Sequence, residues 1–120
     1  MATITAAKRG VGGNAYIYTW ANILAGDTCT AVGGAEFADS SPDRTVQVSG
    51  TFAATIDIQG ALSDTNPIYA GLTDALGVAI SKTAADISAI TEMTTLVKPV
   101  LTGGDGTTNI TVVLLVRGNR

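Results

Sequence analysis

Hydrophobic residues along this chain recur at every second position, which is the period of an extended strand. The clearest case is Asn109–Arg117, which reads NITVVLLVR. On a strand, alternate residues from Ile110 to Val116 point to one side. Val113 and Leu115, which lie between them, point to the other side. Because both sides are apolar, this segment predicts a central strand that is covered on both faces.

Further segments are predicted to be strands from the same alternation: Asn14–Leu24, Thr45–Ser49, Phe52–Gln59 and Thr94–Leu101. The second and third of these form TVQVSGTFAATIDIQG, which predicts a hairpin turning near Ser49–Thr51. Pro99 has no N–H to donate, so it should lie at a sheet edge or a bulge. Short strands are expected on both sides of a turn at Thr73–Gly77, and Ala2–Ala7 is expected to be a strand or an extended arm.

Ala84–Thr95 is the one segment in which a helix competes with a strand. Ile87 and Ile90 fit the spacing of a helix. The threonines and the β-branched residues favour a short turn followed by a strand instead.

The chain of 120 residues shows no internal repeat and no domain boundary. Its connections are short and rich in glycine, as at Gly10–Gly13 and Gly103–Gly106. This organisation is typical of a sandwich or a barrel. We expect an all-β fold, an antiparallel β-sandwich (Ig-like or jelly-roll-like) of about seven to eight short strands. Residues 14–120 would form the single domain, and residues 1–13 an N-terminal arm or edge strand.

Charged residues make up only 14% of the chain, against about 25% in an ordinary domain. We therefore expect a surface that is rich in Thr and Ser or is partly buried against other subunits. The net charge is −3 and the basic residues are scattered, which argues against a nucleic-acid partner. No apolar run approaches the roughly 20 residues of a membrane span and no signal-peptide core is recognisable, so we expect no membrane partner and synthesis in the cytoplasm.

The residue types that catalysis and metal binding usually need are scarce. There is no histidine, and Cys29 is the only cysteine, which excludes structural zinc, most nucleophilic triads and an intrachain disulfide. No pair of carboxylates stands out, and Asp57 is expected to face solvent or a partner subunit because it alternates with isoleucines. We expect no catalytic residue, no metal and no cofactor, and hence no enzyme.

The GGDG of LTGGDGTTN, at residues 103–106, could suggest a phosphate or calcium loop. A phosphate loop leads into a helix, whereas a strand follows here. A calcium loop needs several oxygen ligands, and Asp105 is the only carboxylate side chain after Glu92. We interpret the segment as a hairpin turn whose glycines adopt positive φ.

Tyr16, Tyr18 and Trp20 alternate along one predicted strand and therefore share one face. Aromatic residues in such a row are typical of a core or a subunit interface. A platform on which sugar rings stack is the alternative.

The C-terminal half resembles a family of small proteins from tailed-bacteriophage genomes. The resemblance covers about Arg44–Arg117, through TVQVSGTFAATIDIQG, the polar SDTNPIYAGLTDALGVAIS and LVKPVLTGGDGTTNITVVLLVRG, and it is most specific at GGDGTT. Where that family often has a tryptophan, this chain has Ile68 or Tyr69. The resemblance implies a virion structural protein, of the head decoration (cement) type.

That resemblance implies the major capsid protein as partner and a location on the outer surface of the capsid. It also implies self-association, with a trimer favoured over a dimer. The candidate interface residues are Ala2, Thr3, Ile4, Thr5, Tyr16, Tyr18 and Trp20. A carbohydrate-binding module with an aromatic face and a tail or neck component are the alternative functions.

Overall fold

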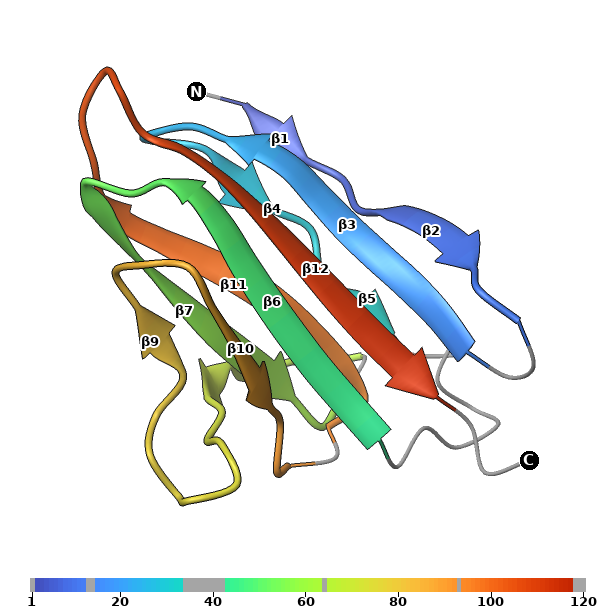
Figure 1. Ribbon diagram of the computed structural model, residues 1–120. Helices are drawn as coiled ribbons and strands as arrows, with labels where there is room; N and C mark the ends of the chain where they lie inside the picture. The colour runs from blue at the N-terminus through green and yellow to red at the C-terminus, as the bar shows by residue number, and fades with distance from the viewer. Residues whose placement is uncertain (1, 13–14, 34–42, 64, 93, 118–120) are drawn as a thin grey trace.

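The structure, a computed structural model, describes residues 2–12, 15–33, 43–63, 65–92 and 94–117. All regular elements in these residues are strands, and they form two sheets that pack against each other (Figure 1). The predicted all-β sandwich is confirmed. Of the twelve strands in the described residues, seven have four residues or more. Six of these overlap strands expected from the sequence, and the seventh, Ala7–Gly10, shares only Ala7 with the predicted strand or arm Ala2–Ala7.

The front sheet has five strands in the order β10 (Asp86–Ala89), β6 (Asp43–Thr51), β12 (Asn109–Arg117), β3 (Ala15–Ile23) and β2 (Ala7–Gly10). The back sheet has the order β5 (Val32–Gly33), β11 (Leu96–Gly103), β7 (Ala54–Ala61) and β8 (Ala70–Gly71), and β9 (Ser81–Lys82) also pairs with β7. All pairings in both sheets are antiparallel. A separate parallel pair joins β1 (Thr3–Ile4) to β4 (Thr28–Cys29).

The core lies between the two sheets. From the front sheet, β12 contributes Ile110, Val112, Leu114 and Val116, all at most 2% exposed. From the back sheet, the inward side chains include Ile56, Ile58, Val97 and Pro99. Each large apolar side chain buried in this way contributes about 1.5–3 kcal/mol of transfer free energy. The period of two in the sequence therefore corresponds to one inward face on each long strand.

The prediction for β12 is confirmed in one respect and wrong in another. This strand is central, with β6 on one side and β3 on the other. Its second face, with Val113 and Leu115, is only half-buried. Among the described residues, the back sheet packs on the inner side alone, and no strand lies over the outer side (Figure 1). A sandwich of two layers covers only one face of each sheet.

The predicted hairpin of TVQVSGTFAATIDIQG is wrong. The two segments are β6 and β7, and they belong to different sheets: β6 pairs with β12 and β10, and β7 pairs with β11. The connection lies at Phe52 and Ala53 and carries the chain across the sandwich. The physical reason is burial, since strands in opposite sheets can pack Val46 and Val48 against Ile56 and Ile58 in one core.

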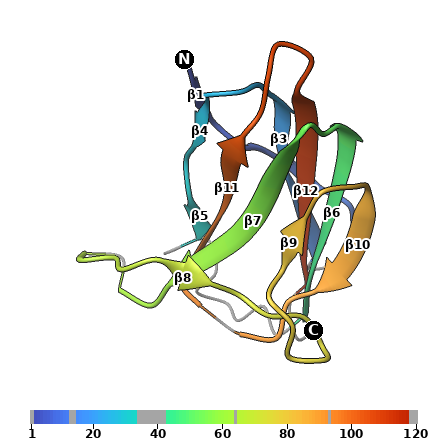
Figure 2. The ribbon, with the colours of Figure 1, turned by 90° about the vertical axis from the view of Figure 1, so that its left-hand side faces the viewer.

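The glycine-rich segment between β11 and β12 is a turn, as predicted, but it does not form a hairpin. It too crosses from the back sheet to the front sheet, at the same end of the molecule as the β6–β7 connection (Figure 2). Gly103 and Gly104 have φ of +78° and +110°, a backbone conformation that L side chains rarely adopt. The prediction of positive φ is therefore confirmed.

The remaining strand predictions agree with the structure in part, since β8 and β9 lie on either side of the turn at Thr73–Gly77, whereas Ala2–Ala7 contains only β1 and the first residue of β2. Ala84–Thr95 contains β10, and the described part of that segment has no helix. Pro99 lies in β11 beyond Val97, where the only strand paired with β11 among the described residues is β7. The missing N–H of Pro99 therefore falls on an edge segment of the sheet, as expected.

Gly104→Ala should destabilise the fold, because the new Cβ would lie 3.0 Å from Ala25 Cβ and from Thr108 Oγ1 at a φ of +110°. We expect a loss of about 1–3 kcal/mol in the free energy of unfolding, measured by urea denaturation. Gly106→Ala is the matched control in the same turn, because its Cβ would meet nothing within 4 Å. Equal effects of the two substitutions would show that backbone strain does not govern this turn.

Candidate interaction surfaces

The predicted N-terminal interface residues lie against their own chain. Thr3 and Ile4 form β1, which pairs with β4. Thr28 N–H donates to the Ala2 carbonyl at 2.9 Å, and Thr30 N–H donates to the Ile4 carbonyl at 2.9 Å. Ala2, Thr3 and Thr5 are nevertheless exposed. A contact of this segment with another subunit or a capsid stays a prediction.

Asp27 anchors this segment. Its Oδ1 accepts the Ala2 N–H and its Oδ2 accepts the Leu24 N–H, both at 2.9 Å. Backbone hydrogen bonds, first from Leu24 and then from Ala2, hold the pKa of the Asp27 carboxyl below its ordinary value of 3.8. The ionised side chain therefore joins the start of the chain to the end of β3.

Asp27→Asn should lower the thermal midpoint at pH 7, because an amide offers only one acceptor oxygen to two N–H donors. A carboxyl whose pKa is lowered on folding stabilises the fold above its unfolded pKa, and this stabilisation disappears as the pH falls through the folded pKa. The thermal midpoints of wild type and Asp27→Asn should therefore approach each other below about pH 4. Thermal unfolding followed by circular dichroism from pH 2 to 7 measures it.

Asp43→Asn is the control for that series, since Asp43 forms an exposed ion pair of 3.0 Å with Arg117 and such pairs contribute little. A difference between wild type and Asp27→Asn that does not change with pH would contradict the role given to the carboxylate.

The aromatic row of β3 belongs mainly to the core. Tyr18 and Trp20 are 2% and 1% exposed, and the Trp20 indole Nε1–H donates to the Thr30 carbonyl at 2.8 Å. Tyr18 and Trp20 are therefore core residues, as the first interpretation of the row allowed, and their rings are not accessible to a partner. They face the back sheet because β3 turns the same side inward as β12. The sugar-stacking platform loses two of its three rings.

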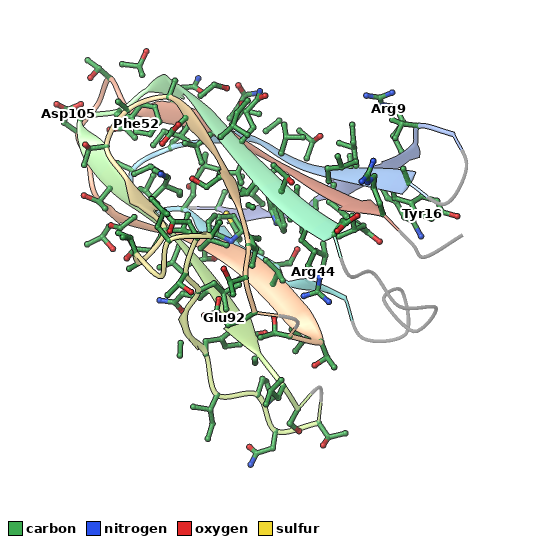
Figure 3. The ribbon with its side chains drawn as sticks, turned by 60° about the horizontal axis from the view of Figure 1, so that its bottom comes forward. Arg9, Tyr16, Arg44, Phe52, Glu92 and Asp105 are labelled. Atoms are coloured by element: carbon green, nitrogen blue, oxygen red, sulfur yellow. The ribbon has the colours of Figure 1, made fainter. Side chains whose placement is uncertain are left out.

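Tyr16 differs from the other two aromatic residues because it is 40% exposed. The Lys8 ammonium lies 4.5 Å from the centroid of the Tyr16 ring, a distance at which a cation is attracted to an aromatic face. Figure 3 shows Tyr16 and Arg9 at the end of the molecule opposite to Asp105. Tyr16 is the one member of the row that can contact a partner.

Arg44 is a buried cation that the sequence analysis did not single out. Its side chain is inward-facing and the residue is only 5% exposed. Nη1 donates to the Thr94 carbonyl at 2.6 Å, and burial lowers the pKa of the guanidinium. Arg44 thus ties the segment after β10 to β6. Its burial could have been predicted from the sequence, because Arg44 alternates with Val46 and Val48 and so shares their inward face.

The carboxylate of Asp105 is occupied within its own turn. Its Oδ1 accepts the Thr107 N–H at 2.8 Å and the Thr107 hydroxyl at 2.6 Å. These hydrogen bonds, the hydroxyl first, lower the pKa of Asp105. No group of three or more possible metal ligands occurs within the described residues. The carboxylate therefore stabilises the turn.

Asp57 points outward from the back sheet, between the inward-facing Ile56 and Ile58. The residue is half-buried, and its Oδ1 is a buried atom that finds no hydrogen-bond donor in the described part of the chain. The sequence analysis expected Asp57 to face solvent or a partner subunit. The outward direction agrees with that expectation, and no partner is present in the structure to test the rest.

Among the described residues, the most exposed large apolar side chain is that of Leu76, at 88%. It lies in the connection between β8 and β9, in a turn from Thr73 to Ala79 that we call the Leu76 turn. Asp74 organises this turn, because its Oδ1 accepts the N–H groups of Leu76 at 2.9 Å and Val78 at 3.1 Å. The Asp74 backbone N–H donates to the Val78 carbonyl at 2.8 Å.

The base of the Leu76 turn is anchored to the segment after β10. Both carboxylate oxygens of Glu92 accept from Thr73, from its N–H at 2.7 Å and from its hydroxyl at 2.6 Å. These bonds, the hydroxyl first, lower the pKa of Glu92. The Thr91 hydroxyl donates to the Asp74 carbonyl at 2.6 Å. A turn held at so many points presents Leu76 in a defined position.

Other exposed apolar side chains occur in the same excursion of the chain between β7 and β9. Leu62 is 73% exposed, Ile68 is 80% exposed and Val78 is 58% exposed. Figure 2 shows the β7–β8 and β8–β9 connections leaving the lower part of the molecule, away from the two crossings at the top. This excursion therefore carries four exposed apolar side chains, with Leu76 counted.

Comparison of the chain with protein-family models, curated proteins and solved structures found no significant match. No helix in the described residues is long and apolar enough to cross a membrane.

Proposed function

We propose that this protein is a structural component of a tailed-phage virion, a decoration protein that binds the outside of the major capsid protein shell and stabilises it. The observation that carries the proposal is the Leu76 turn. It exposes an apolar side chain at the tip of a hydrogen-bonded turn, where water gives that side chain no favourable contact.

A rigid turn suits a binding contact better than a flexible one. Ordering a loop on binding costs free energy, and a turn that is already ordered avoids that cost. Asp74 and Glu92 provide this order, since their carboxylates bond the backbone of the turn. The Leu76 turn is therefore ordered when the chain folds, and Leu76 can enter an apolar pocket of a partner at little further cost of ordering.

The chemistry of the chain supports binding to a protein shell. A sequence without histidine and with one cysteine, whose thiol pKa is raised by burial to about 11, offers few groups for acid–base or nucleophilic work. A charge content of 14% favours apolar contacts over charged ones. A sugar-binding role has less support, because Trp20 and Tyr18 are core residues.

The test is addition of the purified chain to undecorated capsids of the phage whose genome encodes it. We expect saturable binding, measured by co-sedimentation and by the ratio of the two protein bands. Leu76→Ser should weaken binding roughly 30-fold if Leu76 is an interface hot spot worth about 2 kcal/mol. Leu24→Ser is the control, because Leu24 is also an exposed leucine, at 47%, and lies near the opposite end.

Wild-type chain that leaves capsids bare at all concentrations would overturn the proposed function. Equal binding of wild type and Leu76→Ser would instead remove the Leu76 turn from the contact. Immunogold labelling of virions separates head from tail, and label on the tail would favour the tail or neck component.

A further inference from the structure

We propose that the outward face of the front sheet binds a second copy of this chain, sheet against sheet, in a two-fold dimer. This outward face is defined by Ile17, Thr19, Gln47, Ile87, Val113 and Leu115. The strand register places Ile87, Gln47, Val113 and Thr19 in one row across four strands. Leu115 and Ile17 are neighbours in the next row of the same face.

The outward face is apolar along its central strand, β12, where solvent would favour polar side chains. An antiparallel sheet with one face in water normally alternates apolar and polar residues. In β12 the outward positions are Val113 and Leu115, both half-buried by their neighbours alone. Ile87, at the β10 edge, is 62% exposed. The outward face is therefore apolar along β12 and at Ile87, and none of the six residues that define it is charged.

The back sheet provides an internal comparison. Its outward side carries Asp57 on β7 and Lys98 on β11, which alternate with the buried Ile58 and Val97. Charged side chains in the middle of a sheet oppose its burial against another sheet. Thr19, Gln47 and Thr45 are the polar residues at equivalent places on the front sheet, and none is charged. The two sheets thus differ in whether charged side chains lie in the middle of the outward side, and such charges oppose burial.

Charges on the outward face are confined to one end. Arg117 pairs with Asp43 at 3.0 Å, and Arg9 lies beside Ile17 in the strand register. If the two-fold axis runs across the strands, the charged end of each copy faces the uncharged Ser49 and Thr111 end of the other. An axis along the strands would bring Arg117 of the two copies together, so the charge distribution favours the first arrangement.

The available area is sufficient for a reversible dimer. Five strands and seven residues of β12 span roughly 19 Å by 20 Å at ordinary strand spacings. Two such faces have a flat area of roughly 760 Å² in total, below the value of about 1,200 Å² for stable specific interfaces and in the range of weak, transient ones. Packing of one sheet against another is the arrangement already present inside the sandwich. We expect dimers at micromolar concentrations.

This inference does not depend on the proposed function, and it changes one expectation from the sequence. The resemblance favoured a trimer, whereas a face-to-face pair of identical sheets is closed at two copies. A second copy of the chain is the partner proposed for the outward face, because its shape and charge are known from the structure.

Sedimentation equilibrium of the purified full chain, without capsids, from about 1 to 300 µM tests the dimer. We expect a monomer–dimer equilibrium for wild type and a dissociation constant at least tenfold higher for Val113→Lys. Val100→Lys is the matched control, since Val100 is a half-buried outward valine on β11 of the back sheet. It should dimerise as wild type does.

Gln47→Glu is the second variant, because Gln47 is exposed at the centre of the outward face and its replacement should not impair folding. It also should raise the dissociation constant at least tenfold, and it decides the question if circular dichroism shows that Val113→Lys is unfolded. A wild type that stays monomeric, a wild type that forms trimers, or equal dimerisation of Gln47→Glu and wild type would overturn the proposal. A monomeric wild type that loses capsid binding on Gln47→Glu would assign the outward face to the shell instead.

Discussion

The inward face of β12 is the interaction on which the rest of this structure depends. Ile110, Val112, Leu114 and Val116 are at most 2% exposed and belong to the same cluster as the inward residues of the back sheet. The strand also forms backbone ladders with β6 on one side and β3 on the other. Without β12 the front sheet would separate into two pairs of strands, and the back sheet would lose the central part of the surface it packs against.

Two crossings from sheet to sheet set the geometry around that strand. The β6–β7 and β11–β12 connections lie at one end of the molecule, and the register pairs Thr51 with Asn109 between them. Backbone approaches closely there, since a Cβ on Gly50 would lie 2.1 Å from the Asn109 carbonyl oxygen. The turns at this end are closely packed, and the longer connections between strands lie at the opposite end. The Leu76 turn is part of one of these connections.

The candidate surfaces consist of apolar side chains that the core does not bury. A sandwich of two layers buries one face of each sheet. Apolar residues that are not on these two inner faces must therefore lie on the surface. Two of the places where they lie are the Leu76 turn and the outward face of the front sheet. The first is a protruding contact held by carboxylates, and the second is flat and uncharged at its centre. These shapes suit different partners, a pocket for the turn and another sheet for the face.

Local pattern in the sequence determined the strands, the glycine turn at residues 103–106 and the inward set of β12, because alternation and positive φ are properties of the chain within a few residues. It also indicated the scarcity of catalytic groups directly from composition. Which strands pair was decided only by the tertiary structure. The alternation of β6 and β7 is the same in a hairpin as in a crossing, and only the shared core places Val48 and Ile56 in opposite sheets. Burial of Tyr18 and Trp20, and exposure of Val113, likewise depended on which side of the front sheet received the second layer.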